Sequence, residues 1–340
     1  MKGNKDRLLS IVARFPEISL AVVGDLLLDH YIWGKVDRIS PEAPVVVVQV
    51  TEENRRLGGA GNVAHNIASL GAKASVFGVV GDDDGGRQMT ELFRSIGADT
   101  SGVVTDATRP TTVKTRVIAH AQQVVRVDYE VTDPLASSYQ QQLSDALRSG
   151  LARAQGVIVS DYAKGTITPS LFAVLGDASA AGRIGLGKVP VLIDPKAPNF
   201  SIYAHASIIK PNRKEAEEAT GIRIKTRGDA IQAGRKLLRE WNSEMILITL
   251  GELGMVLVGG GGDAEQTVEV DTVAREVYDV SGAGDTVSAV FALALAAGAT
   301  PAEAAMLANF AAGVVVGEVG TVAVTAEELR AAISRGDAAQ

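Results

Sequence analysis

Asp279-Val280-Ser281-Gly282-Ala283-Gly284-Asp285-Thr286 is the stretch that decides the fold, because a glycine-rich turn runs there into an apolar segment at 287–297. Glycines permit backbone conformations closed to other residues, and the first N–H groups of a helix lack partners within it. Such a turn can bind an anion at the helix start. Asp285 falls in the first helical turn, where the helix dipole favours its ionised form, so it can take a proton from a hydroxyl beside the anion. The pattern predicts phosphoryl transfer, and an ordinary turn capped by Asp285 is the alternative.

The composition is that of a soluble globular chain and excludes several classes of function. The 340 residues are 46% hydrophobic and 21% charged, which suits one large domain or two modest ones. The net charge is −7, from 33 Lys and Arg against 40 Asp and Glu, and we expect no nucleic-acid partner. There is no cysteine, and the four histidines show no metal-ligand spacing, so zinc chemistry is not expected. No signal peptide or membrane-spanning stretch is predicted, and we expect a cytoplasmic protein without a membrane partner.

From residue 137 onward, predicted helices and strands alternate. In order, they are helix 138–151, strand 156–160, helix 169–181, strands 189–193 and 206–209, helices 213–219 and 229–241, and strand 245–249. A hairpin is predicted around Gly259 to Gly262, and further helices over 287–297, 301–316 and 326–333. The alternation is typical of an α/β fold with a mostly parallel sheet and helices on both faces, and ligands bind beyond the carboxyl ends of such strands. Polar groups that follow the strands, in segments 161–164, 194–196, 210–212 and 249–251, are therefore expected to line a cleft.

Two carboxylates follow the first predicted strand, at residues 20–23. Gly24 and Asp25 close this strand, and Asp29 follows four residues after Asp25. They could hold a polyol through bidentate hydrogen bonds, although a turn aspartate and a solvated neighbour account for them equally well.

A small sheet is predicted to stand off the main domain. Its β-rich segments, at 31–36, 45–50, 111–119 and 123–129, follow one another without the helices of a βαβ repeat. We place this sheet, the lid, at about 31–57 and 109–130. Such a lid could cover a substrate and exclude water.

Leu57-Gly58-Gly59-Ala60-Gly61-Asn62 is a second glycine-rich entry into a helix. Gly59-x-Gly61-x-x-Ala64 satisfies a loose dinucleotide-binding pattern, but that pattern needs a strand directly before it, and the charged stretch 52–56 intervenes. A dinucleotide oxidoreductase is therefore disfavoured. We favour a close backbone approach to a sugar, with hydrogen bonds from Asn62. The alternative is that the glycines and Asn62 only begin a helix and bind nothing.

Asn212-Arg213-Lys214-Glu215 resembles a capping box, because Asn begins a predicted helix and Glu follows three residues later. The same pair could face phosphates and a hydrated Mg²⁺, which binds through few carboxylates. Both interpretations can hold together.

The two glycine-rich stretches, Gly58 to Asn62 and Asp279 to Thr286, resemble the two signatures of the ribokinase-like (PfkB-type) carbohydrate kinases, and the resemblance spans about 19–333. Further segments are similar to the D-glycero-β-D-manno-heptose-7-phosphate kinases within that family: Gly24-Asp25 with Asp29, Arg38 to Pro44, Ser160 to Gly165 and Val277 to Val280. The resemblance implies a ribokinase-like fold, with 1–340 as a single kinase domain that carries the lid.

The resemblance also implies an activity. ATP would phosphorylate the anomeric C1 hydroxyl of heptose 7-phosphate to the 1,7-bisphosphate, a precursor of lipopolysaccharide core. Alternatives are another ribokinase-like sugar, sugar-phosphate or nucleoside kinase, and a catalytically silent sugar-binding module. The His-x-Gly-His motif of a fused adenylyltransferase is absent from these residues, so we expect a stand-alone kinase.

The resemblance implies a role for each candidate residue. Asp285 would be the base, and the N–H groups of Gly282, Ala283 and Gly284 would stabilise the transferring γ-phosphoryl group. Residues expected to bind ATP and Mg²⁺ are Asn212, Arg213, Lys214, Glu215, which would reach the ion through water, Thr249, Gly251, Gly254 and Asn309. Residues expected to hold the sugar are Asp25, Asp29, Gly59, Asn62 and Lys164.

Two further sites and an assembly are expected. The distal phosphate needs a cationic site on a chain of net charge −7, and Lys164, Arg126 and Arg116 are its candidates. Asp279 matches a position that helps relatives bind a monovalent cation such as K⁺. We also expect a homodimer formed through the lid.

Overall fold

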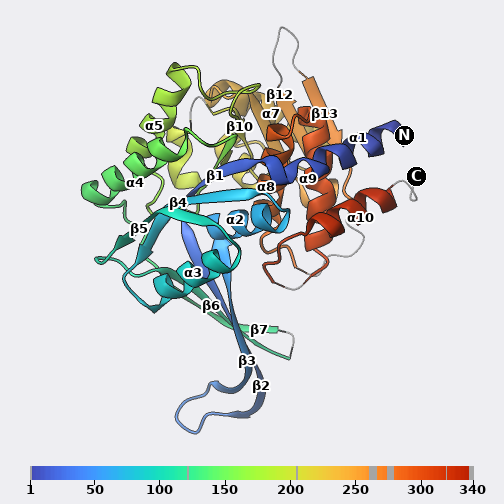
Figure 1. Ribbon diagram of the computed structural model, residues 1–340. Helices are drawn as coiled ribbons and strands as arrows, with labels where there is room; N and C mark the ends of the chain where they lie inside the picture. The colour runs from blue at the N-terminus through green and yellow to red at the C-terminus, as the bar shows by residue number, and fades with distance from the viewer. Residues whose placement is uncertain are drawn as a thin grey trace.

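Two sheets organise the chain in the computed structural model, which describes residues 2–120, 122–203, 206–259, 266–273, 279–318 and 320–336 (Figure 1). Within these residues the larger sheet has nine strands in the order β13-β12-β11-β10-β9-β8-β1-β4-β5. All its neighbours pair in parallel except β11–β12 and β12–β13, which are antiparallel. Its strands are β1 (Ser19–Gly24), β4 (Lys73–Gly81), β5 (Asp99–Asp106), β8 (Gly156–Ser160), β9 (Val191–Asp194), β10 (Ile208–Ile209), β11 (Met245–Thr249), β12 (Met255–Gly259) and β13 (Gln266–Val270).

Helices cover both faces of this sheet, because its central strands are apolar on both sides. In β1, Leu20 and Val22 belong to one hydrophobic cluster, and Ala21 and Val23 belong to the other. The first cluster is completed by α1 (Lys2–Ala13), α2 (Ala60–Ser69), α3 (Asp84–Ser95), α8 (Ala283–Ala296), α9 (Pro301–Val315) and α10 (Ala326–Gly336). The second is completed by α4 (Ser137–Gly150), α5 (Pro169–Ala180), α6 (Arg213–Thr220) and α7 (Arg227–Glu240). The predicted α/β architecture is confirmed.

The predicted small sheet is also present and projects from the body of the molecule (Figure 1). Its order is β3-β2-β6-β7, with β2 and β6 parallel and the other neighbours antiparallel. The strands are β2 (Leu26–Ile39), β3 (Val46–Gly59), β6 (Thr112–Ala119) and β7 (Gln122–Tyr129). We keep the name lid for these four strands. Its function as a cover, within one kinase domain over 1–340, stays a prediction.

One premise of the sequence interpretation is wrong. The charged stretch 52–56 does not interrupt the chain before the glycines, because β3 continues through it to Gly59, where α2 follows directly. Charged side chains are tolerated there because β3 is a lid edge strand. The dinucleotide pattern still lacks its context, since β3 lies in the lid and β4, after α2, lies in the main sheet.

Other differences are local. The helices α1 and α3 and the strand β5 were not predicted. Asp83 caps α3 by accepting a hydrogen bond from the Gly86 N–H. The predicted hairpin turn at 259–262 lies outside the described residues beyond Gly259, as do Val277 and Tyr278. None of the helices in the described ranges combines the length and apolar character needed to cross a bilayer.

Candidate active site

The helix α8 packs against main-sheet strands, among them β8 and β9. Asp25 and Asp161 directly follow β1 and β8, Asp194 ends β9, and Lys210 directly follows β10. These strands are parallel neighbours, so their carboxyl ends share one edge of the sheet. This is the edge at which ligands collect in such folds.

The turn before α8 can only be made by glycine. Gly282 precedes the helix with φ 79°, and a Cβ there would lie 2.6 Å from Thr321 Cγ2 and 2.7 Å from Asn62 Nδ2. The turn is thus packed tightly against α2. In this structure the Ala283 N–H donates to Val280 O (3.2 Å), so its predicted contribution to an anion hole requires that bond to open.

Asp285 is buried, with 2% of its surface exposed. Its Oδ2 accepts a hydrogen bond from Asn62 Nδ2 and its Oδ1 accepts one from the Tyr162 hydroxyl, each at 2.8 Å. Burial, and after it the negative charge of Asp194, raise the pKa of Asp285 to about 7. The helix dipole was expected to favour the ionised form, and burial outweighs it. A carboxyl group with this pKa suits a general base at neutral pH.

Lys210 was not singled out by sequence reasoning, although it lies in a predicted cleft segment. Its buried ammonium lies 3.0 Å from Asp194 Oδ2, which also accepts a hydrogen bond from Ser288 (3.2 Å). A Cβ on Gly284 would lie 3.5 Å from Lys210 Nζ and 4.0 Å from Asp194 Oδ2. The start of α8 therefore faces a space beside the Lys210 ammonium, here called the Lys210 cradle, which a side chain at position 284 would enter. A helix start with a lysine beside it fits a phosphate group.

The predicted capping box at the start of α6 is confirmed. Asn212 Oδ1 accepts from the Glu215 N–H, and Glu215 Oε2 accepts from the Asn212 N–H, both at 3.0 Å. Glu215 Oε1 accepts from Lys196 Nζ at 2.7 Å. Among the described residues, no cluster of three or more acidic or histidine side chains could hold a metal ion. This donor set fits Mg²⁺ only if the ion is held mainly by ATP phosphates and water, so the role of Glu215 stays a prediction.

The other predicted nucleotide-binding residues lie near this capping box or on the adjoining segment. Asn212 and Thr249 form a β-bridge, and Arg213 donates to Leu250 O, while Lys214 is exposed. Gly251 and Gly254 bound a short turn whose end packs against residues 270–272. Asn309 of α9 donates to Asp271 O at 2.7 Å, so it touches the same segment.

The predicted sugar ligands divide into two groups. Asn62 lies beside Asp285 and Gly59 lies beside Tyr162, and their contact with a sugar stays a prediction. The buried carboxylate of Asp25, in contrast, accepts hydrogen bonds from main-chain N–H groups at Tyr162 (2.7 Å), Lys164 (3.0 Å) and Thr166 (3.1 Å). Asp25 thereby shapes the loop after β8, and its contact with a sugar stays a prediction.

Asp29 and the candidate phosphate ligands are all ion-paired. Asp29 pairs with Arg116, Arg126 with Asp128 (3.0 Å), and Lys164 with Glu130 (2.8 Å). Arg126 is 52% exposed, whereas Lys164 is largely buried.

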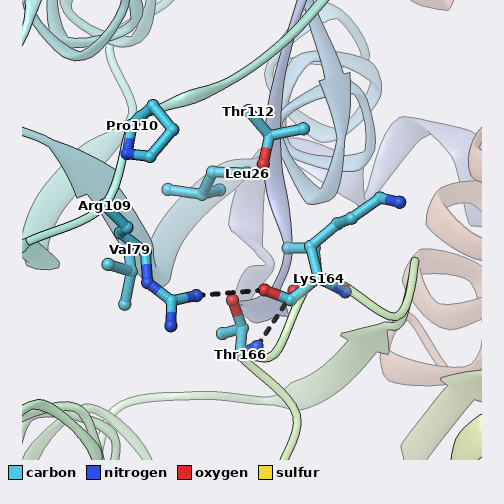
Figure 2. Close-up of a pocket in the computed structure, with 8 residues that line it drawn as sticks. Leu26, Val79, Arg109, Pro110, Thr112, Lys164 and Thr166 are labelled. Carbon is cyan, nitrogen blue, oxygen red and sulfur yellow. Dashed lines mark hydrogen bonds between the residues drawn. The ribbon is translucent and has the colours of Figure 1, made fainter. Parts of the chain in front are cut away.

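A small pocket adjoins the loop after β8 (Figure 2). The Arg109 guanidinium points across it and donates to Lys164 O (3.2 Å), while the Lys164 side chain points away from Arg109. The remaining walls include Asp25, Leu26, Val79, Pro110, Thr112 and Thr166. Arg109 and Asp25 together fix the path of this loop, and sequence reasoning did not anticipate Arg109.

Asp279 lies where the chain enters the glycine turn. Its Oδ1 accepts from the Ser281 N–H (2.8 Å) and its Oδ2 from the Gly320 N–H (2.9 Å). Burial alone would raise the pKa of Asp279. The hydrogen bonds from Ser281 and Gly320 have the larger combined effect, and they hold the pKa below its usual value. A role in monovalent cation binding stays a prediction.

Comparison with known proteins agrees with this geometry. The pattern of the pfkB family carbohydrate kinases matches residues 17–328. "Bifunctional protein HldE" of Geobacter metallireducens is 46% identical over 320 residues, covering 94% of this chain and 64% of its own length. The protein of that name from Caulobacter sp. is 45% identical over 329 residues, covering 95% and 64%. The chain thus spans about two thirds of these relatives' length.

Solved structures share the fold. Ribokinase of Arabidopsis thaliana, complexed with ribose and ATP, has a TM-score of 0.72 and 21% identity, covering 93% of this chain and 98% of its own. Phosphofructokinase-2 from Escherichia coli, in complex with substrates and products, has a TM-score of 0.73 and 18% identity, with the same coverage. On its sequence match and its fold, the chain is a sugar kinase and belongs to the pfkB family of carbohydrate kinases.

Proposed function

We propose that this chain transfers the γ-phosphoryl group of ATP to the C1 hydroxyl of D-glycero-β-D-manno-heptose 7-phosphate. The observation that carries the reaction is the position of Asp285, at the start of α8 between the Lys210 cradle and the turn of Gly59 and Asn62. The heptose substrate rests on the sequence motifs and on 46% identity to proteins named HldE. A cytoplasmic location remains part of the proposal.

The buried residues would divide the chemistry between them. Asp285 would accept the C1 hydroxyl proton as the sugar oxygen attacks the γ-phosphorus and ADP leaves. Lys210 and the N–H groups at the start of α8 would stabilise the charge on the transferring group. Bound Mg²⁺ would neutralise phosphate charge, with Asn212 and Glu215 orienting its waters.

A group of charged side chains near the start of β6 and the end of β7 supports a site for the distal phosphate. Lys114 and Lys164 both contact Glu130, at 2.9 and 2.8 Å, and Lys114 also contacts Asp128 (3.0 Å), which pairs with Arg126. Three cations therefore surround two carboxylates. Lys164 belongs to the loop after β8 that also carries Tyr162. We therefore propose that the 7-phosphate of a sugar bound at Asp285 reaches this group of charges.

Substrate kinetics test this proposal. The native enzyme should prefer heptose 7-phosphate to unphosphorylated heptose, ribose and fructose 1-phosphate. Lys164→Ala should raise KM for heptose 7-phosphate about 10–100-fold, because a charge-assisted hydrogen bond contributes about 1.5–3 kcal/mol, and should leave KM for ATP within about threefold. Lys73→Ala is the control, because Lys73 is exposed and lies at the first residue of β4, whereas the candidate site lies at the carboxyl ends of the strands. Equal kcat/KM for the two heptoses in the native enzyme would rule out the phosphate site.

We also infer that the lid pairs with a second copy of the chain. Apolar side chains are exposed on both of its edge strands, among them Val46, Val50, Val125, Val127 and Tyr129. Apolar side chains concentrated on open strand edges are a pairing surface.

Sedimentation velocity tests the pairing. The native protein should sediment as a dimer, and Val125→Lys with Val127→Lys should give monomers, since two charges would be buried without partners. Val273→Lys, which changes an exposed valine outside the lid, should remain dimeric. A native protein that is monomeric at micromolar concentration contradicts the inference.

A further inference from the structure

The Tyr162 side chain lies between Asp285 and Gly59, two residues of the proposed sugar site. Its hydroxyl donates to Asp285 Oδ1 at 2.8 Å. Its ring lies against the glycine turn, because a Cβ on Gly59 would be 3.4 Å from Tyr162 Cδ2. The phenol therefore bridges the base and the turn predicted to approach the sugar.

Both carboxylate oxygens of Asp285 already accept hydrogen bonds from protein side chains. Asn62 holds Oδ2, Tyr162 holds Oδ1, and Asp285 is almost fully buried. A general base must come within hydrogen-bond reach of the proton that it takes. A substrate hydroxyl thus reaches Asp285 only when the Tyr162 side chain moves away.

The loop backbone is fixed, so the movement belongs to the side chain. Asp25 accepts hydrogen bonds from the N–H groups of Tyr162, Lys164 and Thr166, and Arg109 donates to Lys164 O. Rotation of the Tyr162 side chain breaks only its hydroxyl bond and its ring contacts. Burial raises the pKa of Tyr162 well above its usual value, so the phenol stays a hydrogen-bond donor.

We propose that Tyr162 determines which acceptor is phosphorylated: its hydroxyl holds the acceptor position at Asp285 until a sugar displaces it, and so keeps water out. This inference rests on Asp285 being the base, as proposed above. The reaction that it suppresses is ATP hydrolysis. There, a water oxygen bonds to the γ-phosphorus, the bond to the β–γ bridging oxygen breaks, ADP leaves with the electron pair, and the water proton passes to Asp285.

The test is ADP release from ATP and Mg²⁺ without any sugar. Tyr162→Phe should raise this rate about 5–50-fold, because water can then reach Asp285. Adding Asp285→Asn to Tyr162→Phe should return it to the native level. Tyr139→Phe, on α4 away from the base, is the matched control and should release ADP at the native rate.

A second measurement uses the native protein and needs no variant. The 1-deoxy analogue of the best sugar should stimulate ADP release, since it displaces Tyr162 but offers no hydroxyl at C1. An unchanged rate in Tyr162→Phe together with no stimulation by the analogue would overturn the inference; Tyr162 would then only orient Asp285. The variant assay contains no sugar, so finding a substrate other than heptose 7-phosphate would refute the proposed function and leave the Tyr162 result standing.

Discussion

Asp285→Asn should lower kcat for sugar phosphorylation by about 10²–10⁴-fold while the fold and the affinity for ATP are retained. Asparagine is nearly isosteric with aspartate and can keep one of the two hydrogen bonds to Asn62 and Tyr162, but it cannot accept the proton. Steady-state kinetics and calorimetric ATP titration measure the two effects. Asp177→Asn, an exposed change on α5, is the control and should have native kinetics.

The pH dependence gives this prediction a second test. Burial raises the pKa of Asp285 to about 7, and only its ionised form accepts a proton. The native kcat/KM should therefore rise as the pH increases through about 7 and level off above it. The residual activity of Asp285→Asn should lack this rise. Native activity in the variant, or a flat profile in the native enzyme between pH 6 and 8, contradicts the assignment.

Gly284→Ala should lower kcat/KM for both substrates by about 10²–10³-fold, the range seen when a group that stabilises transition-state charge is lost. The new methyl group would lie 3.5 Å from Lys210 Nζ and 4.0 Å from Asp194 Oδ2, which are ordinary contact distances, so the fold should tolerate it. The methyl group would nevertheless occupy the cradle that a phosphate must enter.

Gly228→Ala is the matched control for this change. Gly228 also lies in the first turn of a helix, and its Cβ would meet only Thr226 Oγ1, at 3.6 Å. Both variants should melt within a few degrees of the native protein, and only Gly284→Ala should lose activity. Native kinetics in Gly284→Ala would show that phosphate does not bind at the start of α8.

The sequence was most informative where structure depends on neighbouring residues. Strands β8 and β11 have the predicted bounds, because short apolar runs there are limited by turns. The capping box of Asn212 and Glu215 was read from spacing alone, since both partners lie in one helical turn. The charged part of β3 was missed because the periodicity of a strand does not reveal that it lies at the edge of a sheet exposed to solvent.

Long-range contacts explain what the sequence could not supply for the site. The two glycine stretches are about 220 residues apart, and only the fold brings Asn62 to Asp285. Nothing in segment 161–164 indicates that Tyr162, rather than a neighbour, reaches the base. The raised pKa of Asp285 likewise depends on burial by surrounding elements, which outweighs the helix dipole that the sequence did predict.

Identification of the product tests the central claim most directly. Native protein would be incubated with ATP, Mg²⁺ and D-glycero-β-D-manno-heptose 7-phosphate, and the products followed by ³¹P NMR. We predict one new phosphate ester, coupled to the anomeric proton at C1, formed in equal amount to ADP while the 7-phosphate signal is retained. A phosphate at another position, or ADP release without any sugar ester while ribose or another sugar is phosphorylated efficiently, would contradict the account.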